Sequence, residues 1–203
     1  MRVGIVGTGA MGTTHAASWA ETPAQIAGFC AETVAGAAAL ADQYRAKAFV
    51  SLEAMLPEVD VVDICTPTYL HPEQVRLAAA AGKDIVCEKP LALDVKSAAE
   101  MLKICDDAGV RLLVAHVLRY FPEYAAAKKM VTEGKLGKPG TIHLRRCNYR
   151  PKKAAGNWFL DDRKSGGLLM DLSIHDFDYA RWVAGEVETV FSATVSAVNR
   201  SEE

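Results

Sequence analysis

Residues with the types and spacing needed for chemistry begin at a glycine-rich turn. Residues 7–12 read G-x-G-x-x-G, directly after a strand-like apolar run and at the start of an amphipathic stretch. In that setting the glycines permit a tight turn, close approach of the main chain to a pyrophosphate, and close packing of helix on strand, while free N–H groups face the phosphates. The alternatives are a turn that binds nothing and an ATP-type P-loop, which is disfavoured because no G-K-[ST] follows. We predict a dinucleotide site at Gly7, Thr8, Gly9, Ala10, Met11 and Gly12.

An acidic residue should accept hydrogen bonds from the adenosine ribose about 20 positions after such a turn. The apolar run 26–30 leads into Ala31 and then Glu32, so Glu32 is the candidate. No Arg or Lys lies in that turn to pair with a 2′-phosphate, which favours NAD over NADP. Glu32 could equally be a solvated acid at a helix start, so NADP stays open as the alternative.

Two further groups follow apolar runs that read as strands. They are the segment 66–71, T-P-T-x-x-H, and the tripeptide Glu88-Lys89-Pro90. Ligands gather at the carboxyl ends of strands in a doubly wound sheet, so both segments should border a bound cofactor. A lysine held between Glu and Pro at a strand end is poorly explained by solubility alone.

A fourth group lies late in the chain, where Asp171 and His175 are four positions apart. On a helix they would share one face. Taken alone, such a pair is more often structural than catalytic, and metal ligation is a lesser alternative. We predict no metal site.

The elements that must position these groups form two patterns. Up to about residue 116, Val- and Ile-rich runs alternate with Ala-rich helical stretches, which is typical of a parallel sheet covered by helices on both faces. We predict six strands, at about 2–6, 25–30, 47–50, 60–65, 84–88 and 111–115. Pro72 marks one helix start and Gly82 its end, and Asp94 and Gly109 do the same for another.

Beyond residue 116 the pattern changes. We expect a helix near 122–133, a strand over 141–149, a loop over about 150–167, a helix over about 168–184 and a strand from near Val187. The chain is therefore α/β, with a Rossmann domain over 1–118 and a partial α+β substrate or dimerisation domain over 119–203.

The order G-x-G-x-x-G, T-P-T-x-x-H, E-K-P and G-G-x-x-x-D-x-x-x-H resembles the glucose–fructose oxidoreductase and inositol dehydrogenase family. The resemblance covers nearly the whole chain. It implies a nicotinamide domain joined to an open-faced, largely antiparallel sheet, in proteins that are usually longer than this one and oligomeric. One departure is that Ala31 stands where Asp is common, which leaves the cofactor preference in doubt.

The same resemblance implies the roles of individual residues. Lys89, Asp171 and His175 would be the catalytic set. His116 and Arg119 match the family's crossover into the substrate domain. Residues near the cofactor would include the glycine turn together with Glu32, Thr66, Pro67, His71, Glu88, Lys89 and Arg119.

The chemistry of an alcohol dehydrogenase suits these side chains. Hydride leaves a secondary alcohol for nicotinamide while the hydroxyl proton goes to a base of near-neutral pKa. His175 suits that task, Lys89 can stabilise developing negative charge or relay a proton, and Asp171 would orient one or both. The sequence leaves open whether Lys89 or His175 accepts the proton first.

Composition narrows the partners. The 23 basic and 25 acidic residues give a net charge of −2, so nothing favours nucleic acid or an anionic membrane. The apolar runs are too short to cross a membrane, and the beginning of the chain does not resemble a signal peptide, so we expect a cytoplasmic protein. The cysteines form no C-x-x-C pair and should be buried, reduced thiols: Cys30, Cys65, Cys87, Cys105 and Cys147.

Three functions are consistent with these features. The leading hypothesis is an NAD(P)-dependent dehydrogenase or reductase acting on a sugar, polyol or related small molecule. An NAD-dependent glycosidase that oxidises and re-reduces its substrate is the second. A non-catalytic regulator that senses dinucleotides is the third. Among other side chains, His15 and the exposed-type His143 are expected to be structural, and Trp158 and Trp182 to be core or interface residues.

Overall fold

The computed structural model describes residues 1–146 and 158–193 and contains a six-stranded parallel sheet. The strand order is β3-β2-β1-β4-β5-β6. From β1 the chain first adds β2 and β3 on one side, and it then adds β4, β5 and β6 on the other side. The change of side lies between β1 and β4, and in doubly wound sheets ligands bind at such a point. All six predicted strands are confirmed, with bounds β1 Arg2–Val6, β2 Gln25–Cys30, β3 Lys47–Phe49, β4 Val61–Ile64, β5 Asp84–Cys87 and β6 Leu112–Val114.

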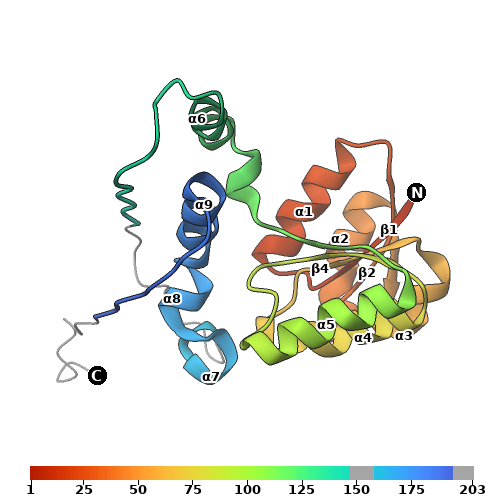
Figure 1. Cartoon of the computed structure of the whole chain (residues 1–203). Helices are drawn as coiled ribbons and strands as arrows, with labels where there is room; N and C mark the ends of the chain where they lie inside the picture. Colours follow the sequence, from red (N-terminus) through yellow and green to blue (C-terminus); the bar gives the residue numbers. More distant parts are fainter. Residues whose placement is uncertain (147–157, 194–203) are drawn as a thin grey trace, which may run out of the picture.

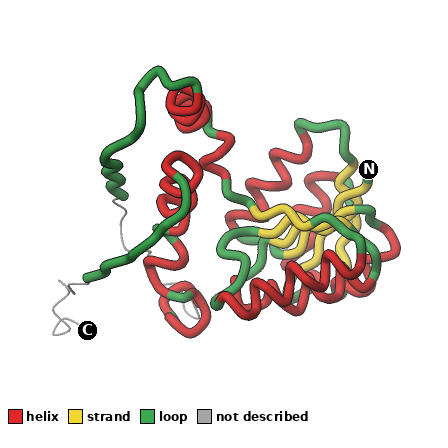
Figure 2. The backbone as a smooth tube through the Cα atoms, viewed as in Figure 1, coloured by secondary structure: helices red, strands yellow, loops and turns green. Residues whose placement is uncertain are grey.

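Helices cover both faces of the sheet, as Figures 1 and 2 show. One face carries α1 (Ala10–Ala20) and α2 (Val34–Tyr44). The other carries α3 (Leu52–Met55), α4 (His71–Ala80) and α5 (Val95–Ala108), with the 3-10 turns η1 (Leu56–Glu58) and η2 (Thr68–Leu70) between strands and helices. The Rossmann-like fold expected for this part of the chain is therefore present.

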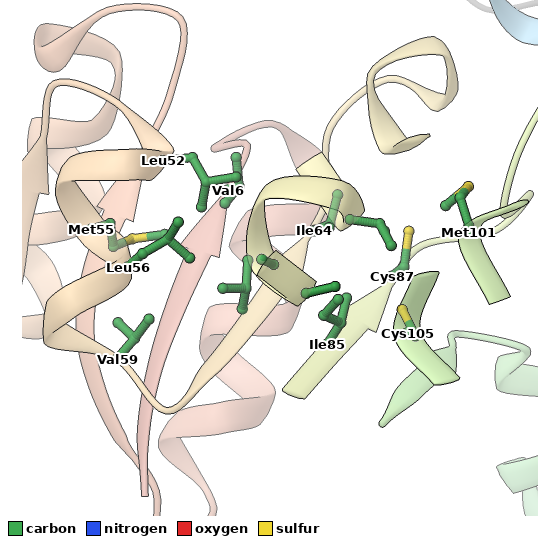
Figure 3. Packing of buried hydrophobic residues seen from close by; sticks show 14 of the residues in the cluster. Val6, Leu52, Met55, Leu56, Val59, Ile64, Ile85, Cys87, Met101 and Cys105 are labelled. Atoms are coloured by element: carbon green, nitrogen blue, oxygen red, sulfur yellow. The ribbon is translucent and has the colours of Figure 1, made fainter. Parts of the chain in front are cut away.

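The two layers have separate apolar cores because side chains alternate across a strand. In β1, Val3 and Ile5 pack toward α1 and α2, whereas Val6 packs toward α3 and α4. In β4, Val62 and Ile64 join that second core, where Met55 and Leu56 lie at one end and Cys87, Met101 and Cys105 at the other (Figure 3). This packing fixes the strand ends on which the site is built.

The capping residues that the sequence predicts lie at the beginnings and ends of the observed helices. The Asp94 carboxylate accepts a hydrogen bond from the main-chain N–H of Ser97, and Gly109 ends α5 with a φ of 67°. That conformation carries little penalty for glycine. Pro72 lies in the first turn of α4, where its missing N–H is not needed.

The second part of the chain forms a separate column beside the sheet (Figure 1). It begins with the 3-10 turn η3 (Val117–Tyr120) and α6 (Pro122–Thr132). After residues outside the described range come η4 (Trp158–Leu160), α7 (Asp162–Ser165), α8 (Gly167–Asp171) and α9 (Ile174–Ala184).

Two expectations for this part differ from the structure. The helix expected over 168–184 is interrupted, because Leu172 and Ser173 form a turn between α8 and α9. Residues 141–146 and 187–193 form no strand, and 147–149 lie outside the described residues. A strand needs a neighbour to pair its N–H and C=O groups, and neither segment has one within the described chain. The expected antiparallel sheet is thus not formed by these residues.

Within residues 1–146 and 158–193, no helix combines the length and apolar character that a membrane crossing requires.

Candidate active site

A cleft of about 1110 Å³ opens at the carboxyl ends of the strands, between the sheet and the helices α8 and α9. The glycine turn, the segment after β4 and the segment after β5 supply one wall. The opposite wall comes from Trp158, Phe159, Asp171, Leu172 and His175. Four groups of residues that are far apart in the sequence therefore meet around one space.

The glycine turn is shaped by contacts at two of its glycines. Gly7 has a φ of +95°, and a Cβ there would lie 2.6 Å from the main-chain oxygen of Cys65. A Cβ at Gly12 would lie 1.9 Å from the main-chain oxygen of Gly7. Only a glycine at position 12 therefore lets helix α1 pack this closely against the turn. Neither position tolerates a side chain without movement of the backbone.

Gly9 differs, because a Cβ there would meet nothing within 4 Å. Gly9 lines the cleft with Thr8, Ala10 and Met11. Since the fold does not need glycine at this position, the open space beside it fits a ligand that approaches the backbone. The N–H groups in the first turn of α1 lack intrahelical acceptors, and this end of the helix carries partial positive charge.

Most of the other predicted cofactor residues line the same cleft. Glu32, Thr66, Pro67 and Glu88 do so. Gly12 instead lies behind the turn.

His71 also lies behind the wall. It is fully buried in α4, with Nε2 2.9 Å from the Thr66 oxygen and Nδ1 3.0 Å from the Pro90 oxygen. Burial lowers the pKa of His71 below its ordinary value, so the neutral ring donates its one N–H to one of these oxygens at a time. His71 therefore joins the segments after β4 and β5 and does not reach the cleft.

Arg119 is likewise not part of the cleft wall. Its guanidinium donates two hydrogen bonds to the Asp178 carboxylate, at 2.9 and 2.6 Å. The pair connects η3 to α9, and thus helps hold the helix that carries His175.

Lys89 and Asp171 are in direct contact. The Lys89 Nζ atom donates to the main-chain oxygen of Asp171 at 2.6 Å and lies 3.5 Å from the Asp171 Oδ1 atom. Asp171 is only 4 % exposed. Burial raises the pKa of its carboxyl above the ordinary value, and the neighbouring Lys89 charge offsets part of that rise.

His175 lies in the first turn of α9 and also lines the cleft. Burial, followed by the charges of Lys89 and Arg146, lowers its pKa to about 4. Its Nδ1 atom is buried and has no hydrogen-bond partner among the described residues. The imidazole is therefore neutral at pH 7 and can accept a proton.

A buried polar network beneath the cleft was not predicted. Asp63, in β4, is completely buried and accepts a hydrogen bond from the indole N–H of Trp19 at 2.6 Å. His15 Nδ1 lies 2.9 Å from Asp63 Oδ2, and His15 Nε2 lies 3.0 Å from Glu88 Oε1. The signal in the sequence was Asp63 itself, a carboxylate within the apolar run Val61–Ile64, together with His15 and Trp19 four positions apart.

The cysteines, His143 and two tryptophans were expected to have structural roles. Cys30, Cys65, Cys87 and Cys105 are buried free thiols, while Cys147 lies outside the described residues. His143 is exposed, although not in a strand. Trp158, expected in a core or interface, lines the cleft, whereas Trp182 packs edge-to-face with Tyr179.

Comparison with known families agrees with this geometry. Residues 1–116 match the family described as an oxidoreductase family with an NAD-binding Rossmann fold, and residues 124–203 match the GFO/IDH/MocA C-terminal domain. The chain belongs to the GFO/IDH/MocA oxidoreductase family. The family expected from the motif order is thereby confirmed.

Individual relatives of this family are similar over most of the chain. Inositol 2-dehydrogenase of Rhizobium meliloti (strain 1021) is 31% identical over 201 residues, which cover 98% of this chain and 59% of that protein. The 2,7-anhydro-N-acetylneuraminate hydratase of Escherichia coli (strain K12) is 36% identical over 143 residues, or 69% of this chain and 38% of that protein. The chain thus spans about two fifths to three fifths of the length of these relatives.

A solved structure is also similar in fold. The WlbA dehydrogenase from Bordetella pertussis, in complex with NADH and UDP-GlcNAcA, superposes with a TM-score of 0.86 at 29% identity. The match covers 98% of this chain and 60% of WlbA.

Proposed function

We propose that this chain carries the cofactor-binding domain and the catalytic side chains of an NAD-dependent dehydrogenase acting on a sugar, cyclitol or polyol. The single observation that carries the proposal is the convergence of Lys89, Asp171 and His175 beside the open space at Gly9. In support, the relatives include a protein named for inositol and a structure holding NADH with a sugar nucleotide. We place the change between the two domains at residues 118 and 119, and we propose that the full-length enzyme is an oligomer.

The cofactor would be held by the glycine turn and the strand ends around it. The pyrophosphate would lie against Gly9 and the first turn of α1, and Glu32 would accept hydrogen bonds from the ribose, which favours NAD over NADP. When bound, the nicotinamide would accept or donate the hydride.

The side chains of this chain would manage the proton and the charge. We propose that His175 accepts the hydroxyl proton of the substrate. Its pKa of about 4 leaves the imidazole unprotonated at pH 7, and it also makes His175 a weaker base than the near-neutral group that the sequence predicts. Lys89 would stabilise negative charge on that oxygen, and because its side chain is only 15% exposed this interaction would be stronger than in bulk water. Asp171 would hold the Lys89 ammonium through the contacts already present.

A second candidate is a reaction without net oxidation. One relative is named a hydratase, so the family includes proteins that are not named for a dehydrogenation. The same residues could then oxidise and re-reduce the substrate in one turnover.

One experiment separates these two candidates. A panel of sugars, cyclitols and polyols is incubated with NAD and, separately, with NADP, using a chain extended to the length of its relatives. Substrate-dependent formation of NADH would support the dehydrogenase. Substrate conversion with no net NADH, yet dependent on NAD, would support the redox-neutral reaction. NAD binding without any conversion, unaffected by replacement of Lys89, would favour a dinucleotide-sensing regulator.

A further inference from the structure

The buried network of His15, Asp63 and Glu88 reaches the proposed active site from behind the sheet. His15 lies in α1 and is 14% exposed, Asp63 is fully buried in β4, and Glu88 follows β5 with 6% of its side chain exposed. The network continues past Glu88, because the second carboxylate oxygen, Oε2, accepts the main-chain N–H of Lys89 at 2.9 Å. Three elements of the sheet domain are thus linked to the backbone of Lys89 through Glu88.

The ring geometry indicates the protonation state of His15. Both ring nitrogens lie within 3.0 Å of a carboxylate oxygen: the His15 Nδ1 atom faces Asp63, and the His15 Nε2 atom faces Glu88. A neutral imidazole has one donor and one acceptor nitrogen, so one of them would face an oxygen lone pair. An imidazolium donates to both carboxylates, and it balances one of two buried negative charges.

The other groups around the imidazole are consistent with this charge. The Cys65 thiol donates to Asp63 Oδ1 at 3.6 Å and the Trp19 indole donates to Asp63 Oδ2, so that both oxygens of this carboxylate act as acceptors. On the cleft side, the Lys89 ammonium lies beyond Glu88 and next to Asp171. Burial alone would lower the pKa of His15, but the hydrogen bonds to the Asp63 and Glu88 carboxylates raise it well above its ordinary value.

A metal ion is a less suitable explanation of the cluster. His15, Asp63 and Cys65 bring potential ligand atoms within 4.8 Å of one another. However, the distances of 2.9 and 3.0 Å between His15 Nδ1 and the Asp63 oxygens are those of direct hydrogen bonds, and the Trp19 N–H occupies one of these oxygens.

We propose that His15, as an imidazolium held between Asp63 and Glu88, is a positioning residue for Lys89. It fixes one oxygen of the Glu88 carboxylate, and the other oxygen then holds the Lys89 backbone so that its ammonium reaches Asp171. The role assigned to Lys89 rests on the proposed function, whereas the charge of His15 and its effect on Lys89 can be measured without any turnover.

The first measurement is the protonation of His15 in the unmodified chain. Nitrogen-15 NMR of the imidazole should show protons on both ring nitrogens and no titration through about pH 6.5, where an unperturbed histidine loses its proton. A His15 ring that titrates in that range, or that carries one proton at pH 7, would overturn the proposal.

The second measurement is the chemical exposure of the Lys89 amine. His15→Gln keeps an amide donor but removes the positive charge and replaces two donor nitrogens on opposite sides of a ring with one. Asp63→Asn removes the negative charge that faces the ring. In either folded variant, acylation of Lys89 followed by mass spectrometry should be faster than in the parent, relative to the exposed Lys96. The matched control is the same substitution at the exposed His143, which should leave Lys89 labelling unchanged. Unchanged labelling in folded His15→Gln would contradict the proposal.

The third measurement uses the extended enzyme once a substrate is known. His15→Gln should lower kcat by about 100-fold, the usual consequence of a catalytic group displaced by about 1 Å, with little change in the Kd for NAD. A variant with full kcat would overturn the positioning role. If the parent enzyme itself converts no substrate, the proposed function fails, while NMR and acylation still decide the role of His15.

Discussion

The Lys89 Nζ atom donates a hydrogen bond to the main-chain oxygen of Asp171, across 82 positions of sequence. Lys89 lies two residues after the end of β5, whereas Asp171 is the last residue of α8 in the second part of the chain. The contact joins the two parts within the cleft itself, so a change in how they pack would move the ammonium. The position of the Lys89 ammonium and the docking of α8 are therefore coupled.

Replacement of Gly9 should separate cofactor binding from folding. Gly9→Val places a side chain in space where a Cβ meets nothing within 4 Å, so the fold should survive while NAD binding is lost. Isothermal calorimetry gives the affinity, and circular dichroism with thermal unfolding checks the fold. Gly12→Val is the contrasting variant, because its Cβ would lie 1.9 Å from the Gly7 oxygen and should destabilise the domain. Undiminished NAD affinity in Gly9→Val would refute the assignment of the turn.

Replacement of Lys89 should affect turnover more than cofactor binding. In the extended enzyme, Lys89→Ala is expected to lower kcat by at least about 100-fold, the usual cost of removing one donor that stabilises charge in the transition state. The Kd for NAD should change little. Lys96→Ala is the control, since that ammonium is 86% exposed on α5 and far from the chemistry proposed here. Full activity of Lys89→Ala would place the reaction elsewhere.

Glu32 should set the preference between the two dinucleotides. Removal of its carboxylate in Glu32→Ala is expected to weaken NAD binding and to narrow the difference between NAD and NADP, because a carboxylate repels a 2′-phosphate. Affinities for both dinucleotides are measured by calorimetry. Glu21→Ala, at the exposed end of α1, serves as the control. An unchanged affinity ratio would show that the ribose is recognised by another residue.

His175 should make stability depend on acidity in a defined range. Its pKa is about 4 in the folded chain and 6.5 when unperturbed, so the unfolded chain binds more protons between these values. Burial of the neutral His175 therefore contributes fully to the free energy of unfolding above pH 6.5, and this contribution is lost as the pH falls toward 4.

His175→Gln removes this titration and should flatten the profile. The expected difference is about 1–2 kcal/mol, less than the full linkage value because the imidazole is only half-buried and water screens it. Urea unfolding at several pH values measures it. Parallel profiles for the parent and His175→Gln would mean that His175 is not held neutral by its surroundings.

The sheet domain was predictable because its signals are local. Each strand is a short apolar run bounded by turn residues, and the caps at Asp94 and Gly109 act within a few residues of themselves. The glycine turn was likewise readable, because its position between a strand and a helix is a local property. These features survive in the structure with boundaries shifted by one or two residues.

The second part was less predictable because its elements depend on distant partners. Residues 141–146 carry a strand-like pattern, yet without a neighbouring strand their backbone groups remain unpaired within the described chain. Asp171 and His175 were expected on one helix face, whereas the turn at Leu172–Ser173 puts them on two helices that both face the cleft.

The sequence alone determined the alternation of strands and helices up to about residue 116, and it named the glycine turn, Lys89, Asp171 and His175 as candidate site residues. Only the tertiary structure decided that His71 lies behind the cleft and Arg119 in an ion pair, and that His15 connects Asp63 to Glu88. The physical reason is that a hydrogen bond or a pKa depends on which groups lie within a few ångströms in space. Residues separated by dozens of positions acquire such neighbours only when the chain folds.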